Sequence, residues 1–162
     1  MTALAAYRDD GPLAAALARA LERAGTPGAA AARGEGRFAW AVPPVLRLLE
    51  YGALIALSAL AGGSLPGCFA LLAVLAFHHY DIVYRLRHQR IGPPAWLRAA
   101  GGGWEGRLIG AAALAALGLL AEGTVVAAVV LGVLYVTESV RSWVSFLGGG
   151  PSAYDDEDAA EE

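Results

Sequence analysis

The chain has 162 residues, of which 57% are hydrophobic and 17% are charged, and its formal net charge is −3. A soluble domain of this size carries about 25% charged residues, so the composition argues against an ordinary soluble protein and favours one compact membrane domain with polar ends. All twelve Lys-or-Arg residues are arginine, and no stacking aromatic residues alternate with them, which argues against a nucleic-acid partner. The single cysteine, Cys68, excludes an intrachain disulfide.

The first segment, residues 1–40, is polar to neutral. Pro12 is typical of the first turn of a helix, and Leu13, Leu17 and Leu21 recur on one helical face. We therefore predict a short N-terminal amphipathic helix. Residues 25–37, which follow it, are mainly Gly, Ala, Pro and Arg, and this composition is typical of a flexible linker.

Two long stretches are almost free of charge. Residues 51–80 contain no Asp, Glu, Lys or Arg, and residues 108–137 contain only Glu122. Each stretch is interrupted near its middle, at residues 62–67 and at Glu122-Gly123. Because a membrane-spanning helix needs about 20 mostly apolar residues, the pattern predicts an all-α fold, a four-transmembrane-helix bundle made of two helical hairpins within residues 41–147. The expected helices are 44–62, 66–86, 104–121 and 124–143.

The segments beside the hairpins differ in character. Between the hairpins, the proline pair before Ala95 and the glycines at 101–103 break helical structure. Residues 95–100 between these breaks are expected to form one interfacial turn with Trp96 as its anchor. Residues 148–162 begin with glycines and a proline and end in a run of acids, so we predict a disordered acidic tail.

Arginine is absent from both expected hairpin tips and flanks their open ends. Cytoplasmic loops of membrane proteins carry an excess of Lys and Arg. The distribution therefore predicts a multi-pass protein of the plasma membrane with both termini in the cytoplasm.

The third expected helix is rich in small residues. Gly106 and Gly110 form a G-x-x-x-G pattern, and alanines follow it. Small residues let membrane helices approach each other closely. We expect this face either to pack in the centre of the bundle or to form a homo-dimer interface.

The inner end of the second expected helix carries most of the chemistry. His78, Asp81 and Arg85 are spaced to share one helical face. Carboxylates also occur near the inner ends of the other three helices, and a lone carboxylate within a membrane costs about 2.5–3.5 kcal/mol unless it is paired, hydrated or bound to a cation. The expected convergence of these groups defines a candidate polar cluster: Glu50, His78, Asp81, Tyr84, Arg85, Glu105, Arg107, Glu138 and Arg141.

Two other interpretations of this cluster stay open. The acids could form only structural ion pairs with arginines one turn away, whose long side chains reach water. Alternatively, His78, Asp81 and Glu50 offer nitrogen and oxygen ligands for a metal ion. No H-x-x-x-H or C-x-x-C spacing supports that site, so no metal is assigned, and no cofactor or catalytic residue is assigned either. The chain also lacks a nucleophile elbow, a P-loop and a dinucleotide fingerprint.

Three stretches, residues 7–14, 78–85 and 103–107, resemble an actinobacterial integral-membrane domain of unknown function. Such domains are found C-terminal to nucleotidyltransferase and CDP-alcohol phosphatidyltransferase modules. The resemblance covers nearly the whole chain. It implies an association with CDP-alcohol or inositol-phosphate lipid chemistry, and it transfers no catalytic residue.

The chain itself does not carry the phosphatidyltransferase motif. That family's motif reads D-x-x-D-G-x-x-A-R followed by G-x-x-x-D-x-x-x-D, with Asp residues that bind metals. Here Tyr7 occupies the first Asp position, Ala15 occupies the Arg position, and no Asp occurs between Asp10 and Asp81. The residues that would form the metal cage are therefore missing.

The sequence favours a non-catalytic accessory or scaffold module for phospholipid-headgroup metabolism. Its expected partners are membrane lipids and a nucleotidyltransferase or CDP-alcohol phosphatidyltransferase. The alternative is an inner-leaflet enzyme that acts on a phosphate-bearing headgroup through Asp81, Glu105 and the arginines. A transporter ranks last, because the middle of the helices offers only Ser58, Cys68 and Glu122 as polar groups.

Overall fold

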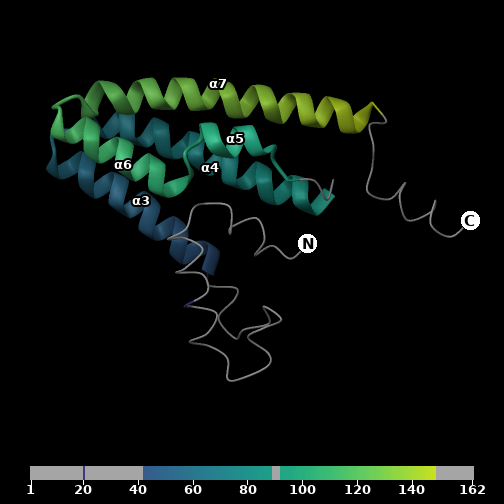
Figure 1. Ribbon diagram of the computed structural model, residues 1–162, viewed down its shortest axis with the longest axis horizontal. Helices are drawn as coiled ribbons and strands as arrows, with labels where there is room; N and C mark the ends of the chain where they lie inside the picture. The colour runs from purple at the N-terminus through teal and green to yellow at the C-terminus, as the bar shows by residue number, and fades with distance from the viewer. Residues whose placement is uncertain (1–19, 21–41, 89–91, 149–162) are drawn as a thin grey trace, which may run out of the picture.

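The computed structural model describes residue 20 and residues 42–88 and 92–148. Within these ranges the fold is all-helical, as predicted, and contains no strand. The expected N-terminal helix, the linker and nearly all of the acidic tail lie outside the described residues. The helices, labelled as in Figure 1, are α3 (Val42–Leu60), α4 (Leu65–His88), α5 (Ala95–Ala100), α6 (Gly103–Ala116) and α7 (Leu120–Leu147).

The four longer helices form two hairpins, α3–α4 and α6–α7, whose turns lie at the same end of the molecule (Figure 1). We call this the tip end and the opposite one the base end. Gly62 in the first turn has φ 72° and Gly118 in the second has φ 71°. Glycine adopts this left-handed conformation without the steric cost that other residues meet. These two glycines therefore allow each hairpin to reverse its direction.

The second turn lies four residues earlier than the sequence indicated. We expected the break at Glu122-Gly123, but α6 ends at Ala116 and both of these residues belong to α7. Glu122 lies in the first turn of α7, where the helix dipole favours a carboxylate. A Cβ atom on Gly123 would lie 2.5 Å from Cδ1 of Leu114. This glycine therefore serves the packing of α7 against α6.

The shorter α6 corrects the expectation of four membrane-spanning helices. Its 14 residues rise about 21 Å, less than the hydrocarbon thickness of about 30 Å. Only α4 and α7, among the helices described here, are long and apolar enough to cross a membrane. Helix α3 has 19 residues but carries Arg47 and Glu50 in its first half. By length and composition, two of the described helices rather than four could cross a membrane.

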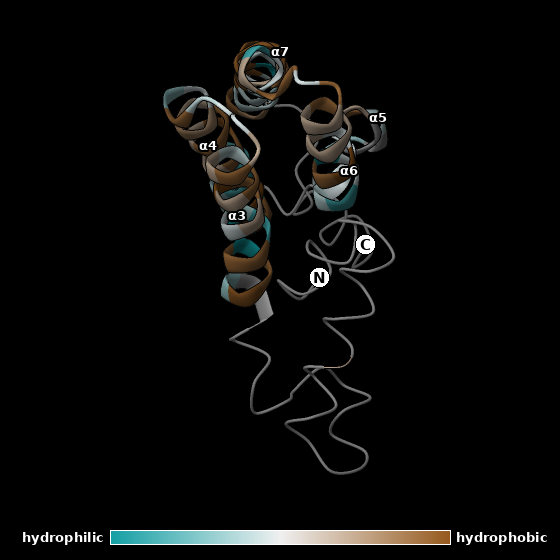
Figure 2. Ribbon diagram, turned by 90° about the vertical axis from the view of Figure 1, so that its left-hand side faces the viewer, coloured by the Kyte–Doolittle hydropathy of each residue, from teal (hydrophilic) through white to brown (hydrophobic). Residues whose placement is uncertain are grey.

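The helices make a closed ring of contacts, α3 with α4, α4 with α7, α7 with α6, and α6 with α3. Seen from the tip end, α3 and α4 lie on one side and α5 and α6 on the other, with α7 joining the two sides (Figure 2). Buried apolar residues from each of the described helices α3–α7 fill the interior: Leu54, Cys68, Leu71, Leu75, Leu97, Ala111, Leu120, Ala128 and Tyr135.

The G-x-x-x-G face of α6 does not pack inside this ring. Gly106 and Gly110 are exposed, and a Cβ atom on either would meet nothing within 4 Å. Our expectation that these glycines allow close packing within the bundle is therefore wrong. Small residues that a neighbouring helix does require are Gly123 of α7, against Leu114, and Gly67 of α4, against Thr124 and Val125.

Gly63 and Gly52 provide a matched pair of substitutions that tests the first hairpin. A Cβ atom on Gly63 would lie 2.8 Å from the backbone Cα of Ser58, whereas Gly52, inside α3, has nothing within 4 Å. We expect Gly63→Ala to lower the melting temperature of the purified protein. Gly52→Ala should raise it slightly, since alanine stabilises a helix interior by about 0.5–1 kcal/mol relative to glycine. Equal melting temperatures for both variants would contradict the turn geometry.

Candidate functional site

The buried charged side chains gather in the interior on the base side of the apolar core and form two groups. The Glu50 cluster comprises Arg47, Glu50, Tyr51, His79 and Arg107, and the Arg85 cluster comprises Asp81, Arg85, Glu138, Ser139 and Trp143. Each cluster draws side chains from both hairpins. The two clusters therefore connect the hairpins by charge as well as by packing.

Glu50 is fully buried and bridges α3 to α6. Its Oε2 accepts a hydrogen bond from Nη1 of Arg47 at 2.5 Å, and its Oε1 accepts one from Nε of Arg107 at 2.7 Å. Nη2 of Arg107 also pairs with Oε1. The same guanidinium donates through Nη1 to the carbonyl of Gly101 at 3.2 Å. Glu50 and Arg107 together therefore hold α3, α6 and the α5–α6 connection in one place.

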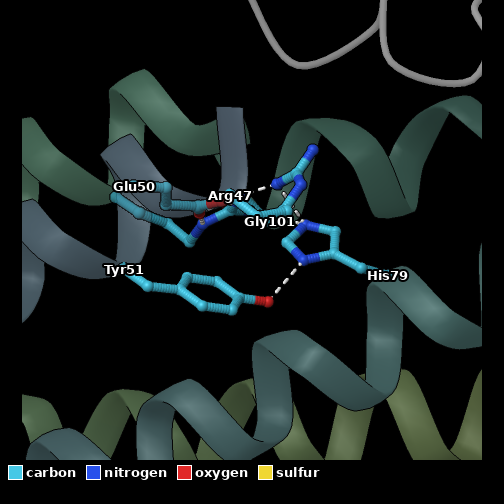
Figure 3. A network of polar contacts seen from close by, with 6 residues as sticks. Arg47, Glu50, Tyr51, His79 and Gly101 are labelled. Carbon is cyan, nitrogen blue, oxygen red and sulfur yellow. Dashed lines mark hydrogen bonds and ion pairs between the residues drawn. The ribbon is translucent and has the colours of Figure 1, made fainter. Parts of the chain in front are cut away.

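His79 links α4 to this cluster (Figure 3). Its Nε2 lies 2.7 Å from Nη1 of Arg47, and its Nδ1 lies 2.8 Å from the hydroxyl of Tyr51. Arginine can only donate, so Nε2 must be the acceptor. We therefore assign the neutral tautomer with its proton on Nδ1, which donates to the Tyr51 oxygen.

The Arg85 cluster joins α4 to α7. Arg85 is 2% exposed and donates through Nε and Nη2 to Oδ2 of Asp81, at 2.7 and 2.5 Å. Its Nη1 donates to Oε1 of Glu138 at 2.9 Å, and its Nη2 also donates to Oε2 of the same carboxylate. This second contact has the fork geometry in which arginine binds a carboxylate most strongly. One guanidinium therefore holds two carboxylates, one from each hairpin.

All the hydrogen-bonding capacity of Asp81 is in use. Oδ2 accepts the two Arg85 donors, and Oδ1 accepts the hydroxyl of Ser139 at 2.8 Å and the indole N–H of Trp143 at 3.4 Å. An ionised carboxylate has about four acceptor sites, and these four donors occupy them. Asp81 is also 5% exposed. In this conformation it has no open site for a substrate or an ion.

His78 points to a different partner from its neighbour. Its ring stacks on Tyr135 of α7, with centroids 3.7 Å apart and planes 6° apart. Tyr135 is itself buried, and a Cβ atom on Gly101 would lie 2.5 Å from its hydroxyl oxygen. The two adjacent histidines thus separate, His79 toward α3 and His78 toward α7.

The formal charges of the two clusters are opposite. The Glu50 cluster holds two guanidiniums and one carboxylate, and the Arg85 cluster holds one guanidinium and two carboxylates. With His79 neutral, the sums are +1 and −1. Removing one member of a buried ion pair is far more costly than the pair is stabilising, because the partner stays buried and uncompensated. A pairing of the hairpins that separated these charges would therefore leave buried ions without partners.

The predicted polar cluster is brought together only in part. Glu50 with Arg107, and Asp81 with Arg85 and Glu138, are in direct contact, but the carboxylates divide between two clusters. The remaining four predicted residues take other positions. His78 stacks on Tyr135, Tyr84 lies 5.6 Å from Trp143 between ring centroids, Glu105 is half-buried in the first turn of α6, and Arg141 is exposed on α7.

The ion pairs are only partly the ones expected between residues one helical turn apart. Asp81 with Arg85 follows that rule, but Glu138 pairs with Arg85 of another helix. Within the described part of the chain, no three His, Cys, Asp or Glu side chains are placed to hold a metal ion.

Several members of the site were not predicted. Tyr51, His79, Tyr135 and Ser139 are the main ones, and each is an uncharged polar group facing the interior. Tyr135, Glu138 and Ser139 share one face of an otherwise valine-rich helix. Their position on one face is the signal that the sequence contains, although two of these three residues carry no charge.

Comparison with known proteins finds one family. A family model described as a family of unknown function (DUF5941) matches residues 24–161. No curated protein and no solved structure matches the chain. The matched range includes every residue of both clusters, and it excludes residues 7–14.

Proposed function

Since the chain belongs to the DUF5941 family of unknown function, we propose its role from its own chemistry. We infer a non-catalytic module of the plasma membrane that acts as an accessory or scaffold for an enzyme of phospholipid-headgroup metabolism. The observation that carries the non-catalytic part is the saturation of Asp81 by four donors. A general base needs a free lone pair within reach of the substrate.

The same observation disfavours an inner-leaflet enzyme built on Asp81 and the arginines. Arg85 is engaged by two carboxylates, and Arg107 is engaged by Glu50 and a backbone carbonyl. A phosphate would have to displace these buried partners before it could bind. The arrangement instead suits a rigid connection between two hairpins.

The distribution of polarity supports membrane insertion. The paired charges Glu50, Asp81 and Arg85 are buried, while the outward face of α7 exposes a row of valines. Soluble proteins rarely bury charge and rarely expose a large contiguous apolar surface. Charged residues inside membrane proteins face the interior of the bundle and pair with one another. The exposed valines are Val125, Val126, Val129, Val130, Val133, Val136, Val140 and Val144.

The depth of the charges fits a bundle that is sealed at its tip end. Arg85 is 20 residues from Leu65, which corresponds to about 30 Å along α4. Glu50 is 10 residues from Leu60, or about 15 Å along α3. The ionic interior therefore extends to about half the thickness of a bilayer, deeper than the sequence indicated. Leu54, Leu71 and Leu75 fill the interior toward the tip end, so a transporter remains the less favoured function.

Labelling of single cysteines tests the orientation. In a Cys68→Ala background, Ala61→Cys and Leu119→Cys place a thiol at the exposed tip end, and His88→Cys places one at the exposed base end. We expect a membrane-impermeant maleimide to label both tip variants in intact cells and to label His88→Cys only after lysis. Labelling of His88→Cys alone in intact cells would reverse the orientation, and loss of the protein to a carbonate wash would contradict insertion.

The accessory role is tested by co-purification. The resemblance to domains attached to nucleotidyltransferase and CDP-alcohol phosphatidyltransferase modules motivates this part of the proposal. We expect a tagged chain, extracted from its native membrane in mild detergent, to retain an enzyme of one of these classes. Arg87→Glu, at the exposed base end, should weaken retention, and Glu122→Gln, at the exposed tip end, should not. Elution of the chain without such an enzyme would contradict the proposal.

A further inference from the structure

A groove lies on the outer surface at the base end, between the α5 region and α7. It has a volume of about 390 Å³ and lies outside both clusters except for a shared wall at Glu138. Val133, Thr137 and Arg141 follow one another at intervals of four residues and therefore form one row along α7. Trp96, which is 54% exposed, lies across the groove from this row. The lining residues are Pro94, Trp96, Val133, Leu134, Thr137, Glu138 and Arg141.

The groove changes from apolar to cationic along its length. Val133 is 13 residues from the start of α7 and Arg141 is 21, which correspond to depths of about 20 Å and about 32 Å from the tip end. A hydrocarbon core is about 30 Å thick. In an inserted bundle, Val133 would therefore contact acyl chains, and Arg141 would lie at the level of the headgroups. The ring of Trp96 suits the interface between these layers.

The electrostatics of the groove favour an anion. The one carboxylate in its wall, Glu138, is held by the guanidinium of Arg85 through both of its oxygens. Arg141 is exposed and makes no ion pair with any other described residue. The charge that remains for a ligand is therefore positive. Thr137, whose hydroxyl can donate a hydrogen bond, lies one helical turn from Arg141 in the wall of the groove.

We propose that this groove binds one anionic phospholipid of the inner leaflet. Arg141 and the hydroxyl of Thr137 receive its phosphate, and an acyl chain runs along Val133 toward the tip end. The groove is apolar at one end and cationic at the other, and a phospholipid has the same two parts. A free phosphate would leave the apolar half of the groove uncovered, so a lipid fits better. The inference rests on the membrane insertion proposed above.

Quenching of tryptophan fluorescence tests the site. The full chain is reconstituted in nanodiscs that contain increasing fractions of phosphatidylglycerol or of phosphatidylcholine with brominated acyl chains, which quench a nearby indole. The contribution of Trp96 is the difference between the unmodified protein and Trp96→Phe. We expect half-quenching of this contribution at about fivefold less phosphatidylglycerol than phosphatidylcholine, the ratio given by about 1 kcal/mol for one arginine near an anionic lipid.

Three variants separate the site from general attraction to the membrane. Arg141→Gln should abolish the preference, while Arg87→Gln, an exposed arginine at the base end of α4, should keep it. Thr137→Val should reduce it. Equal quenching by both lipids in the unmodified protein, or a preference that survives Arg141→Gln, would overturn the proposal while leaving membrane insertion intact. Absence of quenching by either lipid would overturn insertion as well.

Discussion

Arg85→Leu is expected to destabilise the folded protein by about 3–5 kcal/mol, the cost of breaking a buried ion pair by removing one partner. The leucine would leave Asp81 and Glu138 facing each other across the α4–α7 interface with a formal charge of −2. Loss of the guanidinium also removes the donors that both carboxylates use. We expect a large fall in the melting temperature of the detergent-solubilised protein, followed by circular dichroism at 222 nm and by size-exclusion chromatography.

Three further variants make the origin of this effect clear. Arg87→Leu removes an exposed arginine two residues away and should change the melting temperature little. Arg85→Lys keeps the charge but loses the fork that holds Glu138, so its melting temperature should lie between the two. The triple variant Arg85→Leu, Asp81→Asn, Glu138→Gln neutralises the cluster and should recover most of the loss. A triple variant as unstable as Arg85→Leu would mean that packing, rather than charge, explains the effect.

The sequence predicted the helical class and the first hairpin well, because both depend on the length of an uncharged stretch and on the position of the glycines that interrupt it. The second hairpin was placed less well. Glu122 looked like part of a loop because it is the single charge in an apolar stretch, yet it lies in the first turn of α7. Gly118 and Gly123 look alike in sequence, and only the structure shows that Gly118 forms the turn, with φ 71°, while Gly123 packs against Leu114.

The candidate site was found in outline but not in its pairing. Spacing along one helix predicts the contact between Asp81 and Arg85, because both lie on α4. It cannot predict that Arg85 also binds Glu138 of α7, or that Arg107 binds Glu50 of the other hairpin. Those contacts depend on which helices are neighbours in the ring. The relative depth of the clusters could not be predicted either, because it depends on where α3 and α6 end.

Glu50→Gln is expected to have an effect comparable to that of Arg85→Leu, although it changes one atom. The carboxylate is fully buried between Arg47 and Arg107, and glutamine would leave both guanidiniums without a counter-charge at about half the depth of a bilayer. The formal charge of the cluster would rise from +1 to +2. We expect a loss of about 3–5 kcal/mol, measured as a fall in melting temperature.

The charge argument makes a sharper prediction for the double variant. Glu50→Gln with Arg107→Gln restores the cluster to +1, so it should be more stable than Glu50→Gln alone, and the four proteins form a double-mutant cycle. Arg107→Gln alone leaves Glu50 with Arg47 and should cost less than Glu50→Gln, because one ion pair survives. Additive losses in the cycle would mean that Glu50 and Arg107 act independently. In that case the ionic connection between α3 and α6 would not be what fixes the two hairpins together.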